Sequence, residues 1–194
     1  LVKPGLQVIL PHPKNTGNGR NTYLAAWGFA LAQPGGNDRS AQDFVARLMQ
    51  NAPLFAAGGR DATTTFMQRR IGDVLVSFES EAELIAREFG KGEFAVVYPS
   101  LSILTEFPVA IVNPVVDKKG TRKLAQAYLE YLWSPAGQEN AAQNYLRPRS
   151  PELLKKYAEQ FPPVRTFTVD EVFGGWSKAF PAHFKDGGTF DQIY

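Results

Sequence analysis

Two glycine-rich loops hold the residues best suited to chemistry. The first loop spans residues 15–20 and the second spans residues 58–60, and each separates a predicted strand from a predicted helix. A helix start presents backbone N–H groups without intrahelical partners and the positive end of the helix dipole. Glycines let the backbone turn toward a ligand, and Thr16 adds a hydroxyl donor to the first loop. Together the loops predict an anion site built from uncharged donors.

Arg20 and Arg60 lie directly at the ends of these loops. Either loop alone is also typical of an ordinary strand-to-helix turn, so the arginines carry part of the argument. A tethered guanidinium can neutralise charge that is relayed through polarised peptide groups. The alternative interpretation is a surface ion pair, with Asp61 or Glu79 as the partner.

Enzyme chemistry finds little support in the sequence. The chain has no cysteine, which excludes thiol nucleophiles, disulfides, cysteine-ligated zinc and iron–sulfur clusters. Its two histidines, His12 and His183, are far apart, and neither a zinc-hydrolase motif, a nucleophile elbow nor a phosphate-binding P-loop is present. The acidic residues 79–83 fit a helix start. We therefore expect no catalytic residues, no metal and no cofactor.

Charge and length narrow the class further. The 21 basic and 19 acidic residues leave a formal net charge of +2, which offers no broad basic face for nucleic acid. The 194 residues suit one domain or two small lobes. The longest apolar runs are too short to span a bilayer, and no signal peptide is visible at the start.

Short apolar runs alternate with helical patterns over the first part of the chain. The predicted strands are residues 6–10, 54–57, 73–78, 94–98 and 109–112. The predicted helices begin near Arg20 and after an N-cap at Ser40, and then span residues 62–70 and 79–89. This alternation predicts an α/β fold with a mostly parallel sheet, whose ligands collect at the carboxyl ends of the strands.

From Pro108 the composition becomes mainly helical. Helix starts are predicted at Thr121, at Ser134-Pro135 and at Ser150-Pro151. An apolar and aromatic stripe in this part is expected to pack in a core, and it consists of Leu124, Tyr128, Tyr131 and Leu132.

Residues 12–20 resemble a signature of the bacterial periplasmic sulfate- and thiosulfate-binding proteins. That signature reads asparagine, proline, lysine, serine or threonine, serine, glycine, any residue, alanine and arginine. The likeness continues in order along essentially the whole chain, through residues 23–28, 72–75, 103–106, 137–138, 144–149, 173–176 and 183–193.

The resemblance implies a type II periplasmic-binding-protein fold, in which two α/β lobes close over a dehydrated anion and deliver it to the membrane subunits of an ABC importer. It implies a hydroxyl donor at Thr16 and backbone N–H donors at Gly17, Asn18 and Gly59. It also implies an aromatic contact from Phe78. Arg20 and Arg60 would supply charge without touching the anion.

Three residues depart from the family pattern. Thr16 stands where serine is usual, and Phe78 stands where tryptophan is common in sulfate-specific members. Without the indole N–H, either sulfate or thiosulfate could be the preferred ligand. Asp61 follows Arg60 where glycine is expected, and its charge weakens anion binding unless Arg60 or Lys14 pairs with it.

The family also has an N-terminal first-lobe segment that has no counterpart in these residues. The resemblance therefore implies a fragment, with residues 1–98 as a central anion-binding lobe and residues 99–194 as a return segment to the incomplete first lobe. Such a lobe exposes apolar surface unless the missing segment or a second copy covers it. An alternative function follows: an interaction or assembly fragment that binds no anion tightly on its own.

The donor chemistry predicts which anion is bound. Sulfate is fully ionised at neutral pH and only accepts hydrogen bonds, which suits N–H and O–H donors. Monohydrogen phosphate carries a proton that would face a donor, at a cost of about 1–3 kcal/mol for each buried mismatch. Apart from Asp61, neither loop offers a carboxylate to accept that proton. We therefore expect sulfate or thiosulfate to bind more tightly than phosphate.

Overall fold

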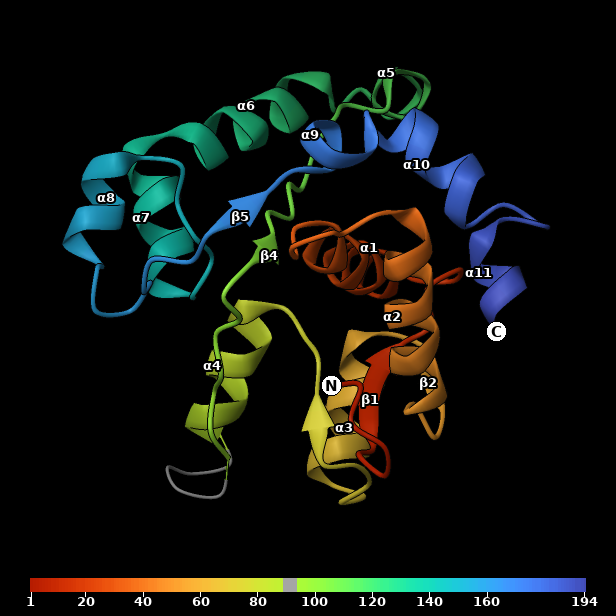
Figure 1. Ribbon diagram of the computed structural model, residues 1–194. Coiled ribbons are helices and arrows are strands. Elements are labelled where there is room, and N and C mark those ends of the chain that lie inside the picture. The colour runs from red at the N-terminus through yellow and green to blue at the C-terminus, as the bar shows by residue number, and fades with distance from the viewer. Residues whose placement is uncertain (89–93) are drawn as a thin grey trace. The chain divides into compact units, whose positions relative to one another are not determined.

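The computed structural model describes residues 1–88 and 94–194, which fall into two compact units (Figure 1). The first unit joins Leu1–Thr105 to Val164–Tyr194, and the second unit is Glu106–Pro163. The predicted end of a helix at Phe89 lies outside the described residues.

Strands and helices alternate in the first unit. Its elements are β1 (Val8–Pro11), α1 (Gly17–Leu31), α2 (Asp38–Gln50), β2 (Phe55–Ala56), α3 (Gly59–Met67), β3 (Val74–Leu75), α4 (Glu79–Glu88), β4 (Ser102–Ile103), β5 (Thr166–Phe167), α9 (Val169–Phe173), α10 (Trp176–His183) and α11 (Thr189–Ile193). The described elements of the second unit are helices, namely α5 (Asn113–Lys119), α6 (Arg122–Trp133), α7 (Pro135–Gln143) and α8 (Pro151–Lys156).

The described strands pair in parallel. Three of them form a sheet in the order β2-β1-β3, in which Pro11 lies opposite Ala56 and Ile9 opposite Leu75. A separate parallel pair joins β4 to β5, with Ser102 opposite Thr166. The prediction of an α/β chain with a mostly parallel sheet is confirmed.

Two predicted strands are wrong. Residues 94–98 and 109–112 adopt no regular structure, although their sequences are rich in valine. Val97 is 82% exposed and Val112 is 60% exposed. A strand needs a neighbour to satisfy its backbone and to cover its apolar side chains, and these segments find none among the described residues.

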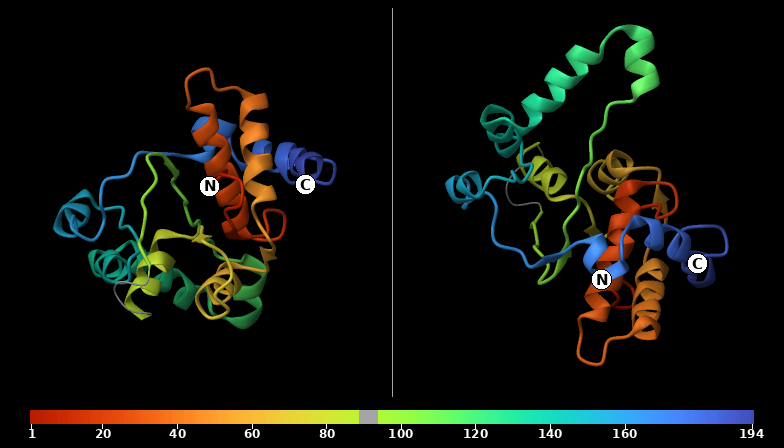
Figure 2. Two further views of the ribbon diagram at one scale, coloured as in Figure 1. Left: turned by 60° about the horizontal axis from the view of Figure 1, so that its bottom comes forward. Right: turned by 90° about the horizontal axis from the view of Figure 1, so that it is seen from above.

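The two faces of β1 pack against different helices. Val8 and Leu10 point to a core that includes residues of α1, α2, α10 and α11, whereas Ile9 points to Ala56 and to Ala62 of α3. Successive strand residues face opposite sides of a sheet, so α1 and α2 cover one face and α3 covers the other. Helices α1 and α2 run side by side in Figure 1 and in both views of Figure 2.

Helix starts follow the predicted capping chemistry with one correction. Ser134 and Ser150 cap α7 and α8, with Pro135 and Pro151 in the first helical positions. Ser40, however, does not cap α2, because that helix begins earlier and is capped by Asn37. Ser40 lies three residues further on and completes a reciprocal capping box.

The stripe on α6 is exposed, and its assignment to a core is wrong for the described chain. Leu124 is 72% exposed, Tyr128 is 62% exposed and Tyr131 is 45% exposed, while Leu132 is half-buried. A groove of about 290 Å³ beside it is lined by residues 110–112, 115–116, 125 and 128–129. The second unit therefore presents apolar surface, as the family resemblance implies. None of the described helices is long and apolar enough to cross a membrane.

Candidate anion-binding site

Parallel pairing brings the two predicted donor loops to the same edge of the sheet. Strands β1 and β2 end side by side, at Pro11 and Ala56. Helix α1 begins after β1, at Gly17, and helix α3 begins after β2, at Gly59 (Figure 1). The starts of both helices therefore lie at the carboxyl edge of the sheet, as the sequence predicts.

Thr16 is the N-cap of α1. Its hydroxyl oxygen accepts a hydrogen bond from the Gly19 N–H at 2.8 Å, and the hydroxyl donates to the His12 carbonyl oxygen at 3.1 Å. Helix geometry leaves the N–H groups of Gly17 and Asn18 without intrahelical partners. Gly17 is exposed, with open space where a side chain would stand. Two predicted backbone donors are thus presented at this helix start.

Gly19 has a role that the sequence reasoning missed. A Cβ atom at this position would lie 2.4 Å from the His12 carbonyl oxygen and 2.5 Å from that of Pro11. Only glycine therefore lets the first turn of α1 approach the end of β1 this closely. The sequence could have indicated this role, because Gly19 directly follows the donor residues Gly17 and Asn18. In dinucleotide-binding strand-to-helix loops, the last glycine likewise permits close packing of the helix on the strand.

The start of α3 uses Asp61 in place of a side-chain cap. Gly58 is the N-cap, in an extended conformation, and makes no side-chain cap bond. The Asp61 carboxylate accepts a hydrogen bond from the Ala57 N–H at 2.8 Å. An acid in the first turn also interacts favourably with the helix dipole. Asp61 thus bonds to the backbone, whereas Arg60 pairs with Glu81 and Lys14 pairs with Asp186 and Asp191.

The two helix starts meet at Asn18. Its side chain is buried, with 8% of the residue exposed. The Asn18 Nδ2 atom lies 3.1 Å from the position that a Cβ at Gly59 would occupy. The structure therefore brings Thr16, Gly17, Asn18 and Gly59 into one neighbourhood.

Arg20 acts on the first loop through a peptide group. Its guanidinium donates a hydrogen bond to the Lys14 carbonyl oxygen at 2.6 Å and lies 5.1 Å from the centre of the Phe180 ring. The positive charge of Arg20 is therefore held against the backbone of the first loop.

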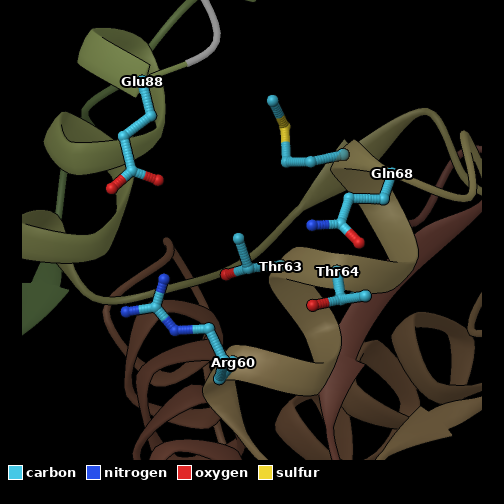
Figure 3. Close-up of a pocket in the computed structure, with 6 residues that line it drawn as sticks. Arg60, Thr63, Thr64, Gln68 and Glu88 are labelled. Atoms are coloured by element: carbon cyan, nitrogen blue, oxygen red, sulfur yellow. The ribbon is translucent and has the colours of Figure 1, made fainter.

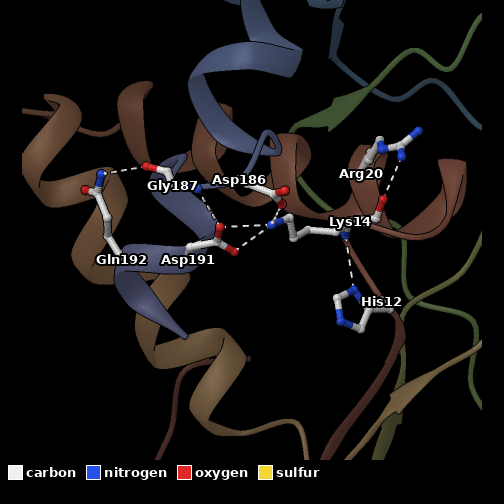
Figure 4. Close-up of polar contacts among 7 residues, drawn as sticks. All are labelled: His12, Lys14, Arg20, Asp186, Gly187, Asp191 and Gln192. Atoms are coloured by element: carbon white, nitrogen blue, oxygen red, sulfur yellow. Dashed lines mark hydrogen bonds and ion pairs between the residues drawn. The ribbon is translucent and has the colours of Figure 1, made fainter.

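Lys14 ties this loop to the C-terminal segment (Figure 4). Its Nζ lies 2.8 Å from the carboxylates of both Asp186 and Asp191, and Asp191 also accepts from the Gly187 N–H. Hydrogen bonds to Asp186 and Asp191 raise the pKa of Lys14. The bond from Lys14, followed by the one from Gly187, lowers the pKa of Asp191.

Arg60 makes a surface ion pair, with Glu81 as the partner. The guanidinium lies 3.3 Å from the Glu81 carboxylate, and 64% of the Arg60 side chain is exposed. The alternative interpretation of Arg60 as an ion-pair residue is therefore correct in kind, but the predicted partners Asp61 and Glu79 are not the residues in this pair.

Phe78 lies at a third helix start. It directly precedes α4, which follows β3, and its carbonyl oxygen accepts a hydrogen bond from the Ala82 N–H at 3.0 Å. The Phe78 side chain is half-buried. Because β3 is the other neighbour of β1, this position faces the same edge of the sheet as the two donor loops.

A small pocket of about 60 Å³ lies between α3 and α4 (Figure 3). It is lined by Arg60, Thr63, Thr64, Met67, Gln68 and Glu88. Arg60 of the second loop lines this pocket, but none of the predicted donors of the first loop does. The pocket is therefore separate from the predicted anion site. Within residues 1–88 and 94–194, no three His, Asp or Glu side chains are grouped as metal ligands.

The chain has an α/β fold in which helix starts follow one another along the carboxyl edge of a parallel sheet, the edge at which such folds bind their ligands. The chain belongs to the family of bacterial extracellular solute-binding proteins, whose family model matches residues 1–147.

Among its relatives are bacterial proteins that bind sulfate or thiosulfate. A thiosulfate-binding protein from Pseudomonas aeruginosa is 58% identical over 194 residues, which are 100% of this chain and 58% of that protein. A sulfate-binding protein from Escherichia coli is 54% identical over 193 residues, covering 100% of this chain and 59% of that protein. The chain thus spans less than two-thirds of the length of these relatives.

A solved structure supports the same fold. The sulfate-binding protein SubI from Mycobacterium tuberculosis superposes with a TM-score of 0.76 at 27% identity, over 95% of this chain and 62% of that one. The predicted resemblance and the periplasmic-binding-protein-like α/β fold are confirmed.

Proposed function

We propose that this chain binds sulfate or thiosulfate at the paired starts of α1 and α3. The observation that carries the proposal is the convergence of these helix starts at the ends of neighbouring parallel strands. The donors are the N–H groups of Gly17, Asn18 and Gly59, while Thr16 holds the first turn. Thr16 would donate to the anion by rotating its hydroxyl away from the His12 carbonyl oxygen.

Phe78 and the two arginines complete the proposed site. Phe78 supplies an apolar wall at the third helix start. Arg20 stabilises the bound charge through the Lys14 peptide group, and Arg60 does so from the surface, where Glu81 offsets much of its charge. The dianion is then held by peptide dipoles, with no formal charge in contact with it.

The wider role follows from the relatives. We propose that the whole protein works in the periplasm, where it passes the anion to the membrane subunits of an ABC importer. It is a binding protein rather than an enzyme, as the names of its relatives support. In the complete family fold, residues 1–98 would form the central lobe and residues 99–194 would return to the other lobe.

Calorimetric titration of the chain with sulfate, thiosulfate, phosphate and molybdate tests the proposal. We expect one of the two sulfur oxyanions to bind most tightly. Tighter binding of phosphate than of sulfate would overturn the proposed site, because a set of pure donors disfavours a protonated anion.

Gly17 permits a sharper test of the backbone donors. Proline is well tolerated in the first helical position, and Thr16 already has the extended conformation that a following proline requires. Gly17→Pro removes one N–H donor, so we expect sulfate affinity to fall about tenfold or more. Gly17→Ala keeps that N–H in open space and is the matched control, with near-native affinity expected.

The exposed apolar side chains of α6 favour a second candidate function. In that case the chain is an assembly fragment that pairs with a second copy or with the segment found in its longer relatives. Size-exclusion chromatography with light scattering distinguishes the two. A stable monomer that binds sulfate tightly would exclude the assembly function, whereas a dimer without anion binding would support it.

A further inference from the structure

The side chain of Asn18 has an unused hydrogen-bond donor at the meeting point of the two helix starts. Asn18 is the second residue of α1, and more than nine-tenths of it is buried. Its Nδ2 atom is buried and has no hydrogen-bond partner. A buried amide group without a partner is costly, and such groups in native proteins usually have a ligand, ion or water to satisfy them.

The oxygen of this amide faces the body of α1. The Asn18 Oδ1 atom accepts a hydrogen bond from the Thr22 hydroxyl, one helical turn further along α1, at 3.4 Å. The Nδ2 atom therefore points away from Thr22 and lies 3.1 Å from the Cβ position of Gly59. Gly59 is the first residue of α3, so the free donor faces the start of the second helix.

We infer that the Asn18 carboxamide donates a hydrogen bond to the bound oxyanion, in addition to its backbone N–H. This inference rests on the proposed function, because it assigns a further donor to that site. It also explains Gly59: a side chain at position 59 would crowd the Asn18 amide at 3.1 Å. Glycine there leaves the amide and the Gly59 N–H facing one ligand.

This amide also contributes to selectivity. Its oxygen is already bonded to Thr22, so only its N–H₂ group is available to the ligand. An oxyanion without protons accepts such a bond with any of its oxygens. Monohydrogen phosphate would present a hydroxyl group to a donor whenever its proton faces Asn18. Asn18 therefore favours sulfate and thiosulfate over phosphate.

Asn18→Asp tests this assignment with almost no change in shape. It replaces the N–H₂ donor by an acceptor, and the dipole of α1 offsets part of the cost of burying the new carboxylate. We expect the affinity for sulfate to fall at least 100-fold. The affinity for phosphate should fall less, because the new carboxylate accepts the phosphate proton. The ratio of the affinity for phosphate to the affinity for sulfate should therefore rise about tenfold or more.

Asn37→Asp is the matched control. Asn37 caps α2, beyond the opposite end of α1, and it undergoes the same change of charge. Its affinity for sulfate should stay within about twofold of the wild type. Asn18→Ala adds a variant without new charge, for which we expect a loss of roughly 10- to 100-fold.

The outcomes separate this assignment from the function on which it rests. A wild-type chain that binds sulfate, with unchanged affinity in Asn18→Ala and Asn18→Asp, would overturn the assignment and leave the proposed function intact. A wild-type chain that binds none of these anions would overturn both. Circular dichroism of each variant excludes loss of the fold as the cause of a weaker signal.

Discussion

The first unit has a buried core on each face of its sheet, whereas the second unit leaves much of its apolar surface exposed. Ile9, Tyr23 and Leu24 in the first unit are completely buried. In the second unit, Leu124 is 72% exposed and Trp133 is 55% exposed. Its described buried residues are few, namely Val116, Gly137, Ala142, Pro148 and Phe161.

The difference lies in what the helices pack against. In the first unit, a parallel sheet provides two faces, and helices from both ends of the sequence cover them. In the second unit, α6 has apolar residues at helical spacing but no sheet among the described residues to cover them. Helical periodicity predicts that a face is apolar, and a partner decides whether that face is buried.

The largest expected difference in stability is between two leucine-to-alanine substitutions, one in each unit. Leu24→Ala removes a completely buried side chain and should lower the free energy of unfolding by about 2–5 kcal/mol. Leu124→Ala, at 72% exposure, should change it by less than about 0.5 kcal/mol. Urea unfolding measures both. Similar decreases in the free energy of unfolding for the two variants would show that Leu124 is buried in solution. That result would contradict the difference between the two units.

Glycine substitutions in the first unit come next. Gly19→Ala pushes a methyl group to within 2.4 Å of a backbone oxygen, so it should cost about 1–3 kcal/mol of unfolding free energy. Gly17→Ala, two residues away in open space, should be neutral or stabilising by up to about 1 kcal/mol. Thermal unfolding distinguishes them, and equal behaviour would contradict the close packing of α1 on β1.

Acid should weaken the first unit before the second. Burial lowers the pKa of His183 below its ordinary value of 6.5, so the unfolded state binds more protons and stability falls as the pH drops below 6.5. In the second unit, the hydrogen bond from Lys156 lowers the pKa of Glu139, so stability is lost only below its ordinary value of 4.5. His183→Gln should therefore reduce the pH dependence between these two values.

Two tryptophans report this pH effect separately. In the first unit, the centres of the Trp27 and His183 rings lie 4.7 Å apart. Trp133 lies in the second unit. Single-tryptophan variants followed by fluorescence during urea unfolding give each signal. His12, whose pKa burial also lowers, contributes to the same range, so His183→Gln should reduce the slope without abolishing it. An unchanged slope would contradict the burial of a neutral His183.

The smallest expected effects come from ion pairs. The Lys14 side chain is 21% exposed beside Asp186 and Asp191, whereas the Lys156 side chain is 61% exposed beside Glu139. Lys14→Met should therefore lower the unfolding midpoint slightly and more than Lys156→Met does. High salt should diminish both effects, because exposed pairs are screened. A larger effect for Lys156→Met would reverse the ranking.

Much of the fold was predictable from the sequence where a segment carries its own signal. The strand at β1, the donor loops and the proline-started helices have local causes, in apolar runs, glycines and caps. Residues 94–98 and 109–112 were mispredicted because a valine-rich run becomes a strand only beside a partner strand. The burial of the stripe on α6 was mispredicted for the same reason, since burial depends on neighbours that are distant in sequence.

The site was predictable in part. The order of strands and helices is sufficient to bring Gly17 and Gly59 to one sheet edge, because parallel strands end together. The partner of Arg60 was not predictable, since Glu81 reaches it from a helix that follows another strand. The unpaired Asn18 amide was also hidden, because a missing hydrogen bond becomes visible only when all neighbours are in place.

The bonds between the first loop and residues 183–191 affect when the chain can fold during its synthesis. Lys14 is separated from Asp191 by 177 positions, and Tyr23 from its hydrogen-bond partner His183 by 160. During synthesis strand β1 emerges long before α10 and α11, which complete its core. Contacts between such distant positions slow folding. The newly made polypeptide should therefore remain open, and accessible to chaperones, until the residues of α10 and α11 have been synthesised.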